Sequence, residues 1–326
     1  MTETTTLRSP GSPPSLDLLN QLVGEVETVF HGKQSVVRLA LAALLARGHI
    51  LFEDVPGVGK TTLANALAGA LGLSFKRIQF TSDLLPSDVL GVSVFNPKTS
   101  DFQVREGPIF TNVVLADEIN RAPPRTQSGL LQAMQEGRVS IDDETHQLPK
   151  PFLLLATQNP LEHHGTYPLP ESQLDRFLMR LTIGYPDAKA ERQILLESAS
   201  TRSRVDDIKP ILTRDQVLAL QEEVEQVRAD ESVMDYLMEI VRRTRTASGF
   251  RLGVSPRGSI ALFRAARAYA LTCGRDYLIP DDIRDLAVPC LAHRLLPAGA
   301  AGTGLDAHEI AAEQLRLILQ EVEVPV

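Results

Sequence analysis

Aromatic residues are scarce in this sequence: they make up 5% of its 326 residues, and tryptophan is absent. Surfaces that stack nucleic-acid bases need such rings, so a stacking platform is not expected. Basic residues are also outnumbered, 33 against 41 acidic ones, which gives a net charge of −8. That balance argues against a protein whose main task is to coat nucleic acid, although a local basic groove stays open as an alternative.

Cysteines and long apolar runs are equally sparse. The two cysteines, Cys273 and Cys290, form no C-x-x-C pair, which favours a cytoplasmic protein without disulfides. No apolar run reaches the length of a membrane span, and the first residues lack the apolar core of a signal peptide. Residues 1–15 are rich in Thr, Ser, Pro and Gly, and we expect them to form a disordered tail.

What the sequence does contain is a phosphate-binding pattern. An apolar run at 49–52 leads into Glu-Asp-Val-Pro-Gly-Val-Gly-Lys-Thr-Thr at 53–62, and a helix-prone run at 63–68 follows. A strand, a glycine-bearing loop and a helix start are the context in which backbone N–H groups cradle phosphates. The residues expected to hold the nucleotide are Val55, Pro56, Gly57, Val58, Gly59, Lys60, Thr61 and Thr62.

Side chains within this loop suit ATP and Mg²⁺. Lys60 would reach the β- and γ-phosphates, and the Thr61 hydroxyl would bind Mg²⁺. Gly57 and Gly59 lack a Cβ atom, so the loop can curl and direct its N–H groups inward. One position departs from the G-x-x-x-x-G-K-[ST] pattern, because Asp54 stands where the first glycine is expected. The structural alternative is a glycine-bearing turn that only caps a helix.

Residues 112–118 form the second informative stretch. Four consecutive apolar residues suit a parallel strand that is buried on both faces, and two carboxylates, Asp117 and Glu118, follow them. Ligands of such sheets bind at the carboxyl ends of the strands. Asp117 is therefore expected to hold Mg²⁺, directly or through water, and Glu118 to orient and deprotonate the attacking water. The alternative is that both acids only cap the next helix.

Further strands are predicted at 76–80, 152–158 and 178–183. The second of these runs on into polar residues that end at Asn159, so the whole stretch is 152–159, and we expect Asn159 to hydrogen-bond the γ-phosphate or the attacking water. The alternative is a turn residue before Pro160. Hairpins are predicted around 92–105 and 139–148, where short β-prone runs flank turn residues.

Helical patterns begin and end the chain. Two helices precede the phosphate loop, and residues 30–33 between them either cover the adenine or only turn the chain. After residue 186, Thr213 and Gln216 form a capping box, and a helix is expected at 231–246.

A later helix begins at Ser255-Pro256-Arg257. A cation this near a helix N-terminus is disfavoured by about 0.3–1 kcal/mol, and a phosphate bound nearby would offset that cost. The alternative is that Arg257 is exposed at a tolerant position.

Five blocks in order resemble the MoxR family of AAA+ ATPases, in the branch that also holds the ATPase subunits of magnesium chelatase. The resemblance covers the chain from about residue 16 to 322, and its blocks are at 53–61, 115–124, 156–160, 174–177 and 255–257. It implies an α/β core at 16–186, with five parallel strands in the order 5-1-4-3-2. A helical lid domain at 187–326 is implied after it.

The resemblance also implies roles for single residues. Asn159 matches the sensor-1 residue. Arg257 matches the sensor-2 arginine, which contacts the γ-phosphate from the lid. Arg176 matches the arginine finger, which reaches the nucleotide of a neighbouring subunit; the alternative is that Arg176 pairs with Asp175 or Asp117 of its own subunit.

The function implied in this way is an ATPase that couples ATP hydrolysis, with Mg²⁺, to chaperone-like remodelling or maturation of protein clients. Its working form would be a homo-oligomeric ring, usually a hexamer, with a von Willebrand factor A domain protein as a partner. The two hairpins would face the ring pore or the client. Two other functions stay open: a motor stimulated by nucleic acid, which the acidic balance disfavours, and a nucleotide-gated scaffold with little turnover.

Overall fold

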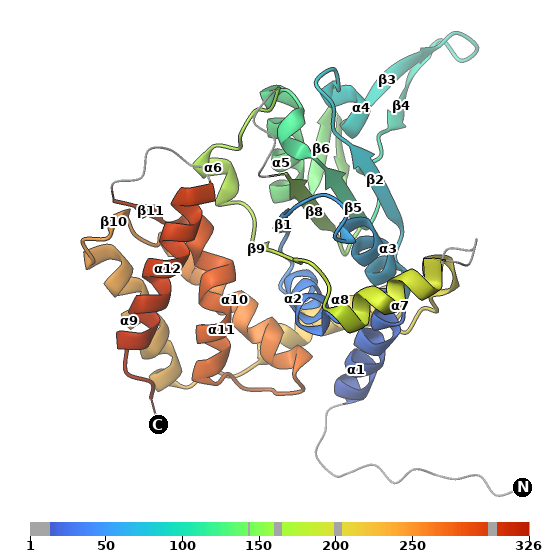
Figure 1. Cartoon of the computed structure of the whole chain (residues 1–326). Coiled ribbons are helices and arrows are strands. Elements are labelled where there is room, and N and C mark those ends of the chain that lie inside the picture. The colour runs from blue at the N-terminus through green and yellow to red at the C-terminus, as the bar shows by residue number, and fades with distance from the viewer. Residues whose placement is uncertain (1–13, 143, 160–164, 199–203, 299–304, 326) are drawn as a thin grey trace, which may run out of the picture.

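The computed structural model describes residues 14–142, 144–159, 165–198, 204–298 and 305–325. Most of the tail expected at 1–15 lies outside these ranges, and its last two residues, Pro14 and Ser15, open the first helix. Figure 1 shows two parts, a sheet flanked by helices and a group of helices formed by the C-terminal third of the chain.

A parallel sheet of five strands organises the first part. Its order is β2-β5-β8-β1-β9, and every neighbouring pair is parallel. Counted along the chain, this is the 5-1-4-3-2 order that the resemblance implies, so that prediction is confirmed. The strands are β1 (Ile50–Glu53), β2 (Phe75–Gln79), β5 (Val113–Asp117), β8 (Leu153–Gln158) and β9 (Met179–Leu181).

Both faces of this sheet are covered. Successive side chains of a strand point to opposite faces. In β1, Ile50 and Phe52 join a core cluster on one side, and Leu51 joins a second cluster on the other. This two-sided burial explains the unbroken apolar runs of the inner strands. The helices of this part are α1 (Pro14–Glu27), α2 (Gln34–Leu45), α3 (Lys60–Ala70), α4 (Pro86–Leu90), α5 (Pro124–Glu136), α6 (Glu171–Leu174) and α7 (Ala188–Ser198).

Two antiparallel hairpins are added to the sheet, at the positions that the sequence predicts. The first projects from the body of the molecule (Figure 1). At its base, a Cβ atom on Gly107 would lie 2.3 Å from the Val89 carbonyl oxygen. The two backbone segments can therefore approach this closely only because residue 107 is glycine. The hairpins are β3 (Gly91–Asn96) with β4 (Asp101–Glu106), and β6 (Arg138–Ile141) with β7 (Glu144–Gln147).

The C-terminal part is helical, as the resemblance implies. The predicted capping box is present: the Thr213 hydroxyl accepts the Gln216 N–H, and the Gln216 side chain accepts the Thr213 N–H. Ser255 caps α10 by accepting the Gly258 N–H at 3.2 Å. The elements are α8 (Arg214–Glu223), α9 (Glu231–Thr246), β10 (Phe250–Leu252), α10 (Pro256–Thr272), α11 (Pro280–Leu291), β11 (Leu296–Pro297) and α12 (Leu305–Glu321).

The segment around α8 contacts the sheet part. The Ile211 N–H donates to the Ala70 carbonyl oxygen at 2.7 Å, and the Gln221 amide donates to the Leu44 carbonyl oxygen at 2.7 Å. The division into domains at residue 186 therefore stays a prediction. Within the described ranges, no helix combines the length and the apolar character needed to cross a membrane.

Candidate nucleotide-binding site

The phosphate loop lies between β1 and α3 and curls at its two glycines. Gly57 has φ +85° and Gly59 has φ +92°, in the left-handed region that side chains disfavour. A Cβ atom on Gly59 would also lie 3.1 Å from the Phe30 ring. The predicted curl is thus present, and residues 30–33 turn the chain between α1 and α2 with Phe30 packed behind the loop.

Asp54, the departure from the glycine pattern, anchors the loop. Its side chain is buried, with the residue 6% exposed. Oδ2 accepts the N–H groups of Ile183 and Gly184, both at 2.7 Å, and Oδ1 accepts the Val55 N–H at 2.9 Å. A carboxylate that accepts three backbone N–H groups ties the loop to the chain that leaves β9, and glycine could not do this.

Lys60 begins α3 and lies at the inner end of the loop. Its Nζ atom donates to the Asp54 carbonyl oxygen at 2.7 Å. Burial lowers the pKa of the Lys60 ammonium, while the carboxylates of Asp54, Asp117 and Glu118 act in the opposite direction. An anionic ligand beside this ammonium would stabilise its charged form further.

The two acids at the end of β5 are held by Thr157 of β8. Its hydroxyl donates to Asp117 Oδ1 at 2.6 Å and accepts the Glu118 N–H at 2.8 Å. Glu118 itself has φ +57°, a left-handed conformation that costs about 1–3 kcal/mol in a non-glycine residue. Thr157 was missed from the sequence, although a hydroxyl one position before the end of a buried strand was a usable signal.

Arginine and glutamine side chains also contact one oxygen of each of the two carboxylates. Arg77 of β2 donates to Asp117 Oδ2 from Nε at 3.0 Å and from Nη2 at 2.5 Å. Gln79, also of β2, donates to Glu118 Oε2 at 3.0 Å, and Arg121 pairs with the same oxygen at 3.0 Å. These three residues were also missed. Arg77 and Gln79 lie on a short exposed strand, which gives no local indication of what its side chains reach, whereas Arg121 lies only three residues after Glu118.

A cavity of about 350 Å³ brings these groups together. Asn159, directly after β8, is 8% exposed and lines it, and its contact with the γ-phosphate or the attacking water stays a prediction. Val55 and Val58 belong to the loop but do not line this cavity, and Val58 is buried beneath it. The lining consists of Pro56, Gly57, Gly59, Lys60, Thr61, Thr62, Arg77, Asp117, Glu118, Thr157 and Asn159.

These residues fit a nucleotide with Mg²⁺. The glycine curl and the start of α3 offer N–H donors and partial positive charge to phosphates. Thr61 and Asp117 line the same cavity with the oxygen ligands that Mg²⁺ prefers. The described residues contain no group of three or more His, Cys, Asp or Glu that could hold a metal ion. Mg²⁺ would therefore complete its coordination with phosphate oxygens and water, as it commonly does.

The two arginines expected to contact nucleotide do not line this cavity. Arg257, in the first turn of α10, has a side chain that is 56% exposed, and its Nη1 lies 3.3 Å from Asp175 Oδ2. The Asp175 carboxylate thus accompanies this cation near a helix N-terminus, and its contact with a phosphate stays a prediction. Arg176 follows Asp175, and among the described contacts the acids considered as its alternative partners pair elsewhere: Asp175 with Arg257 and Arg294, and Asp117 with Arg77.

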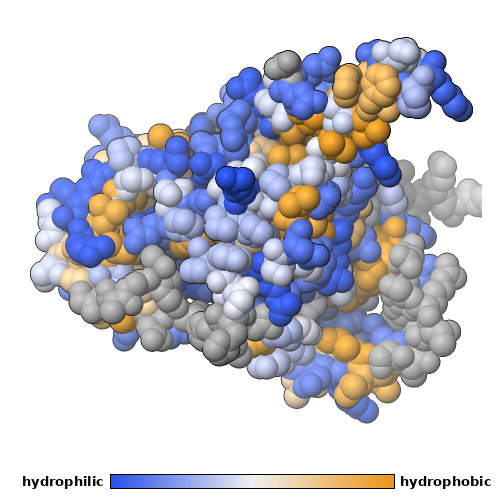
Figure 2. Space-filling model, turned by 90° about the horizontal axis from the view of Figure 1, so that it is seen from above, coloured by the Kyte–Doolittle hydropathy of each residue, from blue (hydrophilic) through white to orange (hydrophobic). Residues whose placement is uncertain are grey.

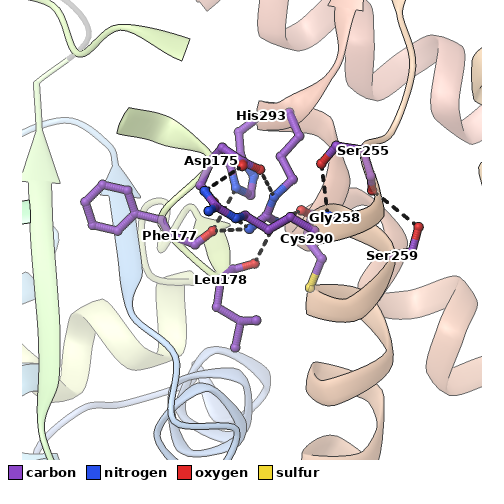
Figure 3. Close-up of polar contacts among 10 residues, drawn as sticks. Asp175, Phe177, Leu178, Ser255, Gly258, Ser259, Cys290 and His293 are labelled. Atoms are coloured by element: carbon purple, nitrogen blue, oxygen red, sulfur yellow. Dashed lines mark hydrogen bonds and ion pairs between the residues drawn. The ribbon is translucent and has the colours of Figure 1, made fainter. Parts of the chain in front are cut away.

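Arg294 fastens the C-terminal part to the segment that carries Arg176. Its side chain is 4% exposed, and Nε donates to Asp175 Oδ1 at 2.8 Å. Figure 3 shows Asp175 and the carbonyl groups of neighbouring residues facing the C-terminal helices. The other acceptors of Arg294 are the backbone oxygens of Asp175, Phe177, Leu178 and Cys290.

Comparisons with known proteins match the chain to a family of ATPases. The family model described as "ATPase family associated with various cellular activities (AAA)" matches residues 49–179, and the AAA lid domain matches residues 242–314. The chain is 39% identical to Chaperone MoxR1 of Mycobacterium tuberculosis, over 97% of this chain and 84% of that protein. It is 53% identical to YeaC of Bacillus subtilis, an uncharacterised protein, over 95% of each chain.

A solved structure is also similar. A crystal structure from Cytophaga hutchinsonii, described provisionally as an ATPase, has a TM-score of 0.87 to this chain at 38% identity. It covers 96% of both chains, so the similarity extends over the sheet part and the C-terminal helices together.

Proposed function

This chain belongs to the MoxR family of AAA+ ATPases, and we propose that it couples ATP hydrolysis to the remodelling of protein clients. The observation that carries the proposal is the composition of the phosphate cavity. It gathers the loop, the lysine, both acids and Asn159, while the arginines at 176 and 257 lie elsewhere. Lys60 and Arg77 of this chain already line the cavity, so the proposal is that another subunit supplies the further arginines at 176 and 257, which supports a ring as the working form.

In the proposed mechanism, the loop N–H groups and Lys60 bind the β- and γ-phosphates of ATP. Glu118 orients the attacking water and accepts its proton, and Asn159 hydrogen-bonds the γ-phosphate or that water. Mg²⁺ held by Thr61 and Asp117 would neutralise part of the phosphate charge. Thr157 orients the Asp117 carboxylate and accepts the backbone N–H of Glu118, which fixes the chain at both acids.

The proposed role of Arg176 is to approach the nucleotide of the next subunit. An arginine finger of this kind contributes about 10³–10⁵ in rate, so an isolated subunit is expected to be slow. Arg257 is joined to the same segment through Asp175, at 3.3 Å. We therefore assign Arg257 to the same neighbouring nucleotide, in place of the contact within its own subunit that the resemblance suggested.

The projecting β3–β4 hairpin is the proposed contact for clients. Phe95 and Phe102 are paired edge to face with their ring centroids 5.4 Å apart, and they are 51% and 66% exposed. Figure 2 shows apolar surface on the projecting hairpin. Paired aromatic side chains left in water at the end of a hairpin suit contact with apolar segments of another protein. A von Willebrand factor A domain protein and a hexameric ring remain part of the proposal through the family.

Mixed subunits test the assignment of both arginines. Arg176→Ala subunits keep an intact cavity, and Lys60→Ala subunits keep both arginines, so a mixture should recover ATP turnover that each variant lacks. The mixture of Arg257→Ala with Lys60→Ala should recover turnover too if Arg257 acts on the neighbour. Absence of recovery at every ratio would place the arginine in its own subunit and contradict this part of the proposal.

Trapping with ATP tests the coupling to clients. Glu118→Gln should bind ATP without hydrolysing it and retain a protein client that the ADP-bound protein releases. The retained protein, once purified, should raise the ATP turnover of the unmodified chain. If it has no effect while DNA or RNA raises turnover in a strongly salt-dependent way, the chain is a nucleic-acid motor and the proposal is wrong.

A further inference from the structure

Arg77 and Gln79 connect the edge strand of the sheet to both acids of the cavity. β2 lies at the end of the strand order, and its residues 77 and 79 are two positions apart, so their side chains lie on one face. In the β2–β5 register, Gln79 lies opposite Asp117 and Arg77 opposite Leu115. Both side chains therefore reach the carboxyl end of β5, where the acids are.

We propose that Arg77 is a positioning residue that competes with the divalent cation for Asp117. It would hold the Asp117 carboxylate in the absence of nucleotide and release it when the metal arrives with the phosphates. This inference rests on the proposed function, because it takes Asp117 as a metal ligand.

The competition follows from the lone pairs of Asp117. Each carboxylate oxygen has two acceptor sites. Two N–H groups of Arg77 occupy those of Oδ2, and the Thr157 hydroxyl occupies one of Oδ1. A metal at Oδ2 requires Arg77 to leave, and a metal at the remaining site of Oδ1 would lie beside the guanidinium charge. In either position the metal ion and the Arg77 guanidinium repel each other.

The exposure of Arg77 makes its release from Asp117 inexpensive. Its side chain is 48% exposed, so the guanidinium regains water when the ion pair breaks, and such pairs contribute little to stability. The pair still orders the site in the absence of ligand, because it fixes the carboxylate that the metal will need.

Release of Arg77 from Asp117 would also affect the contacts of the Glu118 side chain. Arg77 Nη2 donates to Gln79 Oε1 at 2.9 Å, which turns the amide nitrogen of Gln79 toward Glu118 Oε2, 3.0 Å away. Without Arg77 this amide loses the contact that orients it, and Glu118 keeps Arg121 as its other described partner at that oxygen. Metal binding at Asp117 would thus loosen the side chain that has to meet the attacking water.

Binding of Mn²⁺ to the ADP-bound protein tests the proposal without using turnover. Free Mn²⁺ is measured by electron paramagnetic resonance for the unmodified chain and for Arg77→Gln. Loss of an exposed ion pair should tighten Mn²⁺ binding roughly fivefold in Arg77→Gln. Arg77→Lys keeps the charge without the forked geometry, and its affinity should lie between the two.

Lys76→Gln is the matched control, since it removes the same charge from the next residue of β2, and the described contacts give Lys76 no ion pair with Asp117. It should change Mn²⁺ affinity less than about twofold. Equal or weaker binding in Arg77→Gln, with normal binding in the unmodified chain, overturns the competition. Absence of Mn²⁺ binding in the unmodified chain would instead count against the proposed metal site itself.

Discussion

Two arginine–aspartate pairs in this molecule have opposite surroundings. Arg77 pairs with Asp117 in the phosphate cavity, with nearly half of its side chain in water. Arg294 pairs with Asp175 between the sheet and the C-terminal helices, with a side chain that is 4% exposed. Arg77 bonds one acid and one amide, whereas Arg294 bonds one acid and four backbone oxygens.

The difference in exposure indicates that the Arg77–Asp117 pair can be exchanged for other contacts, whereas the Arg294–Asp175 pair is fixed. An exposed pair exchanges protein contacts for water at small cost, and a ligand can therefore displace it. A buried pair has no water to replace its partners, so breaking it leaves charges and carbonyl groups unsatisfied. The cavity is thus expected to tolerate substitutions that stop the chemistry, and the junction around Arg294 is expected to lose stability when it is changed.

The largest effect is expected in the cavity, on turnover alone. Glu118→Gln removes the proposed base, and general bases contribute about 10²–10⁴ in rate, so ATP turnover should fall by at least about 100-fold. Its free energy of unfolding should change by no more than about 0.5 kcal/mol, because glutamine keeps an oxygen for Gln79 and Arg121. Phosphate release and urea denaturation measure the two quantities. A variant that unfolds much more easily would remove the contrast between the regions.

The next effect is expected at the junction, on stability. Arg294→Met fills similar space without donors and should lower the free energy of unfolding by about 3 kcal/mol, as measured in urea. Arg77→Met is the matched control, and it should cost less than about 1 kcal/mol. Equal losses in the two variants would show that burial does not distinguish the pairs.

Acid should weaken the junction through His293. Burial, with the nearby Arg294 charge, holds the pKa of His293 well below its usual value, and His293 Nε2 lies 3.1 Å from the Phe177 carbonyl oxygen. Below pH of about 6.5, His293 is protonated in the unfolded chain but stays neutral in the folded chain. The free energy of unfolding therefore falls as pH falls. From pH 7 to 5, protonation of the unfolded chain at this residue can lower the free energy of unfolding by at most about 2 kcal/mol.

His293→Gln tests that origin, because glutamine can still donate to the Phe177 carbonyl oxygen without titrating. Over the same pH range, the free energy of unfolding of the variant should fall less than that of the unmodified chain, by a difference of at most about 2 kcal/mol. An identical pH dependence in both proteins would assign the acid sensitivity to other buried histidines.

The smallest effect is expected for the exposed partner of the junction. Arg257→Gln breaks a pair whose arginine is 56% exposed, and Asp175 keeps Arg294, so the free energy of unfolding should change by less than about 0.5 kcal/mol. Urea denaturation measures it beside Arg294→Met. A loss as large as that of Arg294→Met would mean that Asp175 depends on both arginines together.

Much of this fold could be predicted because its signals are local. The glycine curl, the buried apolar runs and the caps at Thr213 and Ser255 each lie within a few residues of sequence, and the structure contains all of them. The strand order came from the resemblance and not from such signals.

The contacts that join distant segments could not be predicted in this way. Arg77 meets Asp117 across 40 residues, and Arg294 meets Asp175 across 119. Nothing near either arginine in the sequence indicates its partner, because the partner is fixed only when strands and helices pack. The same limit applies to Arg257, whose helix start was predicted but whose distance from the phosphate loop depends on how the C-terminal helices rest on the sheet.

Asp54 has a consequence of its own. One side chain is shared by the phosphate loop and by residues 183 and 184, the chain that leads toward the C-terminal helices. A displacement of residues 183 and 184 would therefore move the phosphate loop, and a change in the loop on phosphate binding would move residues 183 and 184. A glycine at position 54 would leave the loop and this segment unconnected, whereas Asp54 couples the proposed phosphate-binding loop mechanically to the chain that continues into the C-terminal part.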